Sequence, residues 1–419
     1  MLTYCEYAAL SKTPHALADG LMRVFQHPAY AFNLPRYVLC MMTPMSAAKN
    51  VLFDILCLAG MLAGLPLLGV WLAGFPLAPY LEFPPHTRHV PHAAFSWPVY
   101  GLIAALVAAA VMPLAVRGIR AYRRRPAVEE FQRHPFPWWG WVGILAGIAA
   151  WVLAWTRWPW FAALQPHTFS PLWAAYIVVV NALCCRRTGH SMLTDRPLFF
   201  MGLFPASAAF WWGFEYLNRF VQNWYYAGPA LGPWAYFGYA TLPFATVLPA
   251  VLCTRDLVHS FTWVRRAFGR VPPIPWAAHP LLPRAALAAA AAGLAAIGIW
   301  PDYLFPLLWV SPLLIIVALR GIRGAPHPLQ DFCEEDWTQA VSAVLAALVC
   351  GGLWEMWNYF SLAQWRYSIP FVQRFEVFEM PALGYAGYLP FGLECAAAEN
   401  LLEDVLPAAM KRPCGPKNQ

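Results

Sequence analysis

The chain has 419 residues, of which 60% are hydrophobic and only 12% are charged. A soluble domain carries about 25% charged residues, so this composition excludes an ordinary soluble protein and predicts an integral membrane protein. The formal charge is +7, but the basic residues gather in short loops between apolar runs, so we expect a lipid bilayer as partner and no nucleic acid. The cysteines form no C-x-x-C pair, which indicates packing residues.

Residues 1–50 are polar and irregular, and we expect a cytoplasmic N-terminal segment there. The segment lacks the charged-then-apolar order of a secretory signal. Met41, Met42 and Met45 stand just before the first apolar run, so the native protein begins either at Met1 or at one of these three residues.

About ten apolar runs follow, each near the roughly 20 residues that cross a membrane. They lie at 51–74, 96–116, 138–157, 169–185, 198–218, 234–254, 284–300, 302–320, 338–360 and 380–402. The seventh and eighth runs are short and fit a tilted or broken pair. The predicted fold class is therefore all-α, a polytopic transmembrane helix bundle of about ten spans.

Arginines concentrate in alternate loops, at 117–137, 186–197, 255–283 and after 320. The positive-inside rule assigns these loops to the cytoplasm. Ten spans then leave both termini cytoplasmic, and we expect a multi-pass protein of the bacterial inner (plasma) membrane.

One stretch occurs twice. Glu215 and Glu355 are 140 residues apart (355 − 215 = 140), and so are Asn218 and Asn358 (358 − 218 = 140). Each pair is followed by a Trp-x-Tyr sequence, at 224–226 and at 365–367. The offset predicts two parallel four-helix repeats, related by a pseudo-two-fold axis along the membrane normal.

The repeat divides the chain into further parts. The two units are 138–258 and 284–404, joined by a cytoplasmic linker at 259–283. Two extra helices and a basic cytoplasmic loop occupy 51–137, and 405–419 is a cytoplasmic tail.

A Glu and an Asn three residues apart share one helix face. An acid at the centre of a membrane costs about 2.5–3.5 kcal/mol and marks functional sites. A buried carboxyl can hold a proton and act as a general acid, with the Asn amide orienting it. In the alternative interpretation, each Glu pairs with its own Asn or with Arg219 or Arg366 and only locks helices together.

Further acids occur in the second unit alone, while 246–250 in the first unit is uncharged. We therefore expect the second unit to carry the chemistry and the first to support it. The candidate catalytic residues are Glu355, Asn358, Glu379 and Glu394, followed by Glu215 and Asn218. The candidate substrate-binding residues are Trp211, Trp224, Tyr226, Trp354, Trp365, Tyr367 and Tyr385.

The first outer loop holds His86, His89 and His92 in an H-x-x-H-x-x-H run. Three imidazoles can ligate zinc or copper, but prolines within the run prevent a regular helix, so we expect a solvated loop and no metal. No phosphate-cradling glycine loop, nucleophile elbow or aspartate-rich diphosphate motif is present, and no cofactor is predicted.

The run from Glu355 through the 365–367 sequence and Pro381 to the Pro-Phe-Gly-Leu-Glu segment at 390–394 resembles polytopic carotenoid-modifying enzymes, the membrane lycopene cyclases and carotenoid hydratases. Those families place an acid, an aromatic-rich outer turn and a Pro-x-x-Glu-like segment on successive helices. The paired glutamates typical of the cyclases are missing after Pro390. The chain as a whole resembles an uncharacterised family of bacterial membrane proteins.

Three functions remain open on these observations. The first is an inner-membrane enzyme that acts on a lipid or isoprenoid, with a carboxyl general acid near the outer leaflet and aromatic faces that stabilise a developing cation. The second is a proton-coupled transporter or channel with duplicated halves. The third is a non-catalytic membrane scaffold. The sequence does not predict an oligomeric state.

Overall fold

The computed structural model describes residues 44–124, 134–228 and 231–406. The alternative starts at Met41 and Met42, most of the N-terminal segment and most of the C-terminal tail lie outside the described residues. Residues up to 52 belong to a separate compact unit, which contributes the first turns of helix α5 (Pro44–Leu72). The contacts below all lie within residues 53–419.

The described chain is mostly helical, which confirms the predicted class in its coarse form. After α5 the helices are α6 (Trp97–Arg123), α7 (Trp138–Trp155), α8 (Phe169–Thr188), α9 (Met192–Asp195), α10 (Pro197–Val221), α11 (Pro233–Phe244), α12 (Val247–His259), α13 (Thr262–Phe268), α14 (Leu282–Ala296), α15 (Pro301–Leu304), α16 (Leu307–Ile322), α17 (Thr338–Tyr359) and α18 (Tyr388–Val405). The strands are β1 (Trp224–Ala227), β2 (Gln364–Tyr367), β3 (Glu376–Val377) and β4 (Met380–Pro381).

Within the described ranges, seven helical segments are long and apolar enough to cross a membrane, and ten spans are not confirmed. Helices α14 and α16 have 15 and 16 residues. At 1.5 Å per residue they measure about 22–24 Å, less than the roughly 30 Å of a hydrocarbon core. The run expected at 380–402 becomes helical only at Tyr388, because β4 and a 3₁₀ turn (Ala382–Gly387) precede α18.

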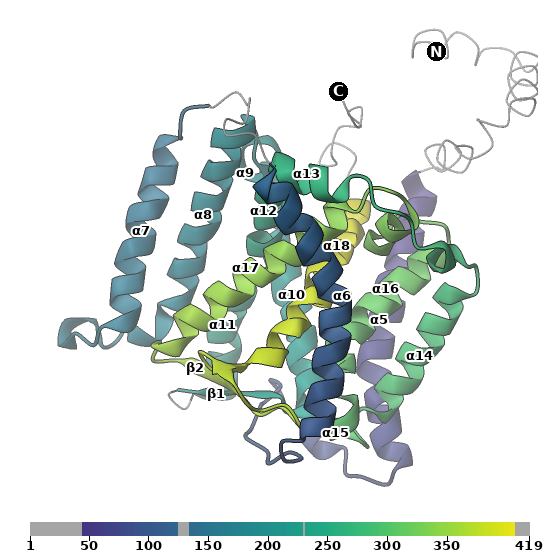
Figure 1. Cartoon of the computed structure of the whole chain (residues 1–419). Helices are drawn as coiled ribbons and strands as arrows, with labels where there is room; N and C mark the ends of the chain where they lie inside the picture. The colour runs from purple at the N-terminus through teal and green to yellow at the C-terminus, as the bar shows by residue number, and fades with distance from the viewer. Residues whose placement is uncertain (1–43, 125–133, 229–230, 407–419) are drawn as a thin grey trace, which may run out of the picture. The chain divides into compact units, whose positions relative to one another are not determined.

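Two helix pairs pack closely through glycines. A Cβ on Gly140 of α7 would lie 2.5 Å from the Cβ of Ala182 in α8, and a Cβ on Gly293 of α14 would lie 2.3 Å from Leu307 at the start of α16. Figure 1 shows α7 and α8 side by side. Any larger residue at these glycines would push the paired helices apart.

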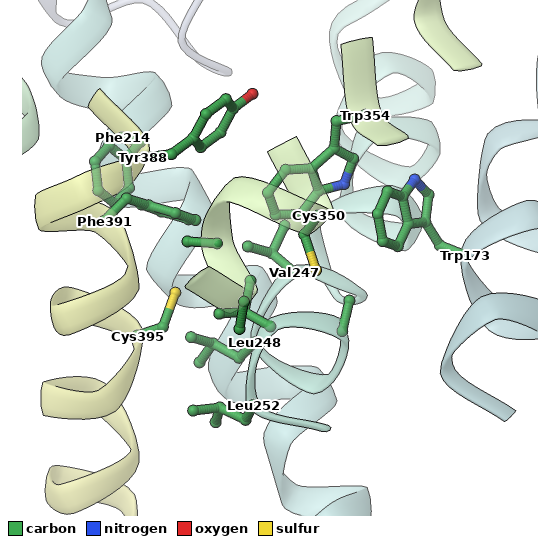
Figure 2. Close-up of a cluster of buried hydrophobic side chains, with 14 of the residues drawn as sticks. Trp173, Phe214, Val247, Leu248, Leu252, Cys350, Trp354, Tyr388, Phe391 and Cys395 are labelled. Carbon is green, nitrogen blue, oxygen red and sulfur yellow. The ribbon is translucent and has the colours of Figure 1, made fainter. Parts of the chain in front are cut away.

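Helices α10, α12, α17 and α18 form the core that carries the candidate site. Its fully buried members include Phe214, Leu248, Leu252, Cys350 and Phe391. Figure 2 shows Phe391 and Cys395 projecting from α18 toward Leu248, with Trp173 and Trp354 facing each other nearby. The Glu–Asn pairs lie at the C-terminal ends of α10 and α17, at the edge of this core.

The two Trp-x-Tyr sequences form antiparallel strands that pair with each other, where the sequence predicted only aromatic-rich turns. Trp224 pairs with Tyr367, Tyr226 pairs with Trp365, and Tyr225 pairs with Arg366 at the centre. The register is thus reciprocal, since the Trp of each strand faces the Tyr of the other. Because β1 follows α10 and β2 follows α17, this ribbon ties together the ends of the two glutamate-bearing helices (Figure 1).

The loop between α5 and α6 packs over the end of α10 instead of standing free in solvent as expected. The Arg219 guanidinium donates hydrogen bonds to the carbonyl oxygens of Tyr80 and Glu82, so it does not serve as the partner of Glu215. The His86 ring stacks on Tyr236, with centroids 5.6 Å apart. No group of three metal-ligating side chains is found in the part of the chain that the structure describes.

His92 and the chain after it are fixed by Asp302. The Nδ1 atom of His92 lies 2.6 Å from Asp302 Oδ1, and the backbone N–H of Ala93 donates to Asp302 Oδ2 at 2.8 Å. The histidine loop therefore belongs to the folded body of the protein.

The last turns of α18 are held by ion pairs with three other parts of the chain. Glu399 pairs with Arg255 of α12, and both side chains are buried. The two remaining pairs are Glu403 with Arg196 at 2.9 Å and Asp404 with Arg320 of α16 at 2.8 Å.

Candidate functional site

Glu215 lies fully buried at the centre of a set of aromatic donors. Its Oε1 atom accepts hydrogen bonds from the indole Nε1 of Trp211 at 3.1 Å, from the indole Nε1 of Trp224 at 3.1 Å and from the Tyr226 hydroxyl at 2.6 Å. Its Oε2 atom is buried without a hydrogen-bond partner among the described residues. Helix α10 supplies Trp211 one turn before the acid, and β1 supplies the other two donors.

Glu355 has a similar but less complete set of donors. Its Oε1 atom accepts hydrogen bonds from the Tyr367 hydroxyl at 2.7 Å and from the Tyr388 hydroxyl at 3.1 Å. The Trp365 indole donates to the Tyr367 hydroxyl at 2.9 Å, so it reaches the acid only through that tyrosine. The Oε2 atom of Glu355 also has no partner within the described ranges.

A glycine explains the difference between the two clusters. Gly351 stands 140 residues after Trp211 (351 − 211 = 140). A Cβ on Gly351 would lie 2.3 Å from the ring of Tyr388, so the ring packs flat against the bare backbone. The indole that α10 offers to Glu215 is thus replaced at Glu355 by a phenol from another helix, α18.

The two asparagines fix the strands instead of orienting the acids. The Asn358 amide donates to the carbonyl oxygen of Trp365 at 2.8 Å, and Asn358 Oδ1 accepts from the Trp365 N–H at 2.9 Å. Asn218 likewise donates to the carbonyl oxygen of Trp224 at 2.8 Å and accepts from the N–H of Asn223 at 2.8 Å. These bonds correct both the expected orienting role and the alternative of a Glu–Asn pair.

The acceptors in both clusters are supplied by neutral tyrosines. Burial, together with the neighbouring Glu215, raises the pKa of Tyr226, and burial together with Glu355 raises the pKa of Tyr367. Both phenols therefore keep their protons at neutral pH and donate them to the carboxyl oxygens. Such donors offset part of the free energy that burial of a carboxyl group costs.

A cavity of about 470 Å³ lies between the two clusters and brings most of the predicted binding residues together. Its wall includes six of the seven candidates, namely Trp211, Trp224, Tyr226, Trp354, Trp365 and Tyr367. Glu355 lines the cavity, whereas Glu215 stands behind its donors and is not part of the wall. The volume lies in the range of small-molecule sites, and the lining is mostly aromatic and apolar.

Three predicted residues lie away from this cavity. Tyr385 is in the 3₁₀ turn before α18, where its hydroxyl donates to the carbonyl oxygen of Val377 at 3.0 Å. Glu379 lies in the partly exposed turn between β3 and β4. Glu394 is fully buried within α18, and neither carboxyl oxygen has a hydrogen-bond partner in the described structure.

Several wall residues were not foreseen from the sequence. Tyr388 is the most important, and the signal for it was the glycine at 351 in the place of Trp211. Trp309 of α16 lies 5.4 Å from Trp224 between ring centroids and extends the aromatic wall. His86 and Thr87 come from the outer loop, whose proline-rich sequence concealed its packing.

Comparison of the chain with protein-family models, with curated proteins and with solved structures gives no match.

Proposed function

We propose that the chain is an integral membrane enzyme that acts on a lipid or isoprenoid, with Glu355 as its general acid. The observation that carries this proposal is a carboxyl group in the wall of an aromatic cavity, with one oxygen held by two tyrosines and the other unpartnered among the described residues. The seven long apolar helices support the membrane setting. The resemblance to carotenoid-modifying enzymes points to the same substrate class.

The chemistry begins with Glu355 in its neutral form. Transfer of its proton to a carbon–carbon double bond forms one C–H bond, breaks the π bond and leaves a carbocation beside the carboxylate. The faces of Trp354 and Tyr367 in the cavity wall stabilise such a cation. Return of a different proton to Glu355 regenerates the acid and yields an isomerised or cyclised product without a further reactant.

The two hydrogen bonds on Oε1 have a defined role in this scheme. They stabilise the negative charge that develops when the proton leaves, and they fix the carboxyl group so that Oε2 faces the substrate. Glu215 has three donors on Oε1 and no place in the cavity wall, which supports a structural role for it.

We further propose that the two glutamate-bearing units are parallel repeats. The reciprocal register of β1 and β2 supports this, because a two-fold axis through the Tyr225–Arg366 pair would exchange the strands. The matched bonds from Asn218 and Asn358 to the following strands support it as well. The arginine-rich alternate loops support a bacterial inner-membrane location with cytoplasmic termini.

A comparison of lipid and pigment extracts tests the enzyme proposal. The strains carry a deletion, the deletion with the wild-type gene, with Glu355→Gln, or with the matched control Glu215→Gln. We expect a precursor that accumulates in the deletion and in Glu355→Gln and is cleared by the wild type and by Glu215→Gln. Identical extracts from all four strains, with both variants present in the membrane, would refute the proposal.

One observation favours a proton-coupled transporter as the second candidate. Glu394 is buried in α18 without a partner for either oxygen in the described structure, as expected for a carboxyl group that gains and loses a proton during transport. In that case the wild type shows pH-dependent flux of a solute in proteoliposomes, and Glu394→Gln abolishes it. Equal flux for both proteins would remove this candidate, and a change in stability alone would indicate a scaffold.

A further inference from the structure

The cavity beside Glu355 changes in character from its rim to its floor. The rim residues His86, Thr87, His167 and Gln364 are polar and partly or fully exposed. They come from the outer loop, from the 3₁₀ turn before α8 and from β2.

The floor is buried and apolar except for the acid. Phe244, Val247, Trp354 and Tyr388 all line it with relative exposures of 5–7%, and Glu355 has 0%. The one acid of the wall thus lies at the deep end, away from the histidines and the glutamine. A ligand with a polar group at both ends would lose its hydration at the floor without gaining enough hydrogen bonds there.

We propose that the cavity binds a single-chain amphiphile tail-first, with an uncharged hydrogen-bonding group such as a hydroxyl at the rim and the far end of its apolar chain against Glu355. The inference rests on the proposed function in one respect, since it makes the tail the reacting end. The rim suits a hydroxyl because imidazole and amide groups both donate and accept hydrogen bonds. No lysine, arginine or acidic residue lines the rim to select a charged head group.

The shape of the wall supports the same direction of entry. Aromatic side chains from both units, including Trp211, Trp309 and Trp354, surround the inner part of the cavity and leave apolar faces toward it. Such faces suit an alkene or methyl-branched chain, because they contribute van der Waals contact and no unpaired polar atoms. Binding buries the chain and leaves the head group in water-accessible surroundings.

Photo-crosslinking of the full-length protein in lipid nanodiscs tests the orientation. The probes are two isomers of hexadecanol, one with a diazirine next to the terminal methyl group and the other with a diazirine next to the hydroxyl-bearing carbon. We expect the first isomer to label Trp354 or Tyr388 and the second to label the segment of His86 and Thr87 or that of His167. The reverse pattern, or the same pattern for both isomers, would overturn the proposal.

A filled-floor variant and a competition experiment supply the controls. Ala240→Trp adds an indole at a buried position of the cavity wall in α11 and should reduce floor labelling severalfold, whereas Leu242→Trp on the exposed face of the same helix should not change it. Unlabelled hexadecanol should compete and hexadecane should not. Equal competition by hexadecane would refute the role of the polar rim.

The outcome is separable from that of the extract comparison. Glu355→Gln should keep the tail-first labelling of Trp354 and Tyr388, because its amide retains the shape of the floor. Tail-first labelling with unchanged extracts would refute the enzyme proposal alone. Altered extracts with head-first labelling would refute the orientation alone.

Discussion

Replacement of Gly351 by alanine tests how the Glu355 cluster is built. The added methyl group would lie 2.3 Å from one ring carbon of Tyr388 and 2.5 Å from another, so the ring must move. Overpacking of this kind costs about 1–3 kcal/mol, and loss of the Tyr388–Glu355 hydrogen bond adds about 1 kcal/mol. The next residue, Gly352, has open space around its Cβ position and provides the matched control.

Both substitutions gain about 1 kcal/mol of helix propensity, so their difference isolates the clash. We expect Gly351→Ala to be about 2–4 kcal/mol less stable than Gly352→Ala. With an unfolding entropy of about 2.1 cal/mol/K per residue over 419 residues, its apparent Tm in detergent should be about 2–4 °C lower. Near-UV circular dichroism during a thermal ramp measures both values.

The Tyr388→Ala background gives a second readout. Without the ring, the methyl group at position 351 meets no obstacle, so Gly351→Ala should become neutral or stabilising there. Equal melting temperatures for the two glycine variants in the native background would refute the account of Tyr388 given above. So would a penalty that persists after the ring is removed.

Three further outcomes are expected. Asn358→Ala loses both bonds to the backbone of Trp365 and should lower the free energy of unfolding by about 1–3 kcal/mol, with faster hydrogen exchange across 364–367; unchanged exchange would contradict the tether. Arg255→Ala leaves Glu399 buried without its main charge partner and should cost about 3–5 kcal/mol, measured by thermal unfolding, whereas a cost near zero would show that the pair is hydrated. Burial lowers the pKa of His327 to about 4, so the unfolded chain binds more protons between pH 6.5 and pH 4 and stability should fall as the pH drops through that window, less so in His327→Gln.

The sequence contained most of the candidate cavity because its signals are local. The 140-residue offset links Glu215 to Glu355 and one Trp-x-Tyr to the other, and six aromatic candidates proved to line one cavity. Residue spacing along a helix is sufficient for such predictions. It does not say which strand a short aromatic segment will pair with, so the ribbon of β1 and β2 was missed.

Contacts between distant segments account for the other errors. The partner of Glu355 at Tyr388 lies 33 residues away on another helix, and nothing in the sequence around Glu355 indicates it. The asparagines were assigned to the acids because they share a helix face, yet backbone groups of the following strands compete for the same amides. Hydrophobicity alone likewise overestimated the spans at 284–300 and 302–320, where turns shorten the helices.

The ion pairs at the end of α18 bear on the order in which the protein is assembled. A helix with four acidic residues is poorly accepted by hydrocarbon on its own, since each exposed charge near the centre costs about 2.5–3.5 kcal/mol. Three of those acids meet arginines that precede α18 in the chain, at positions 196, 255 and 320. Synthesis from the N-terminus therefore makes every partner available before α18 emerges, and the insertion of this helix becomes a docking reaction onto a bundle that already holds its counter-charges.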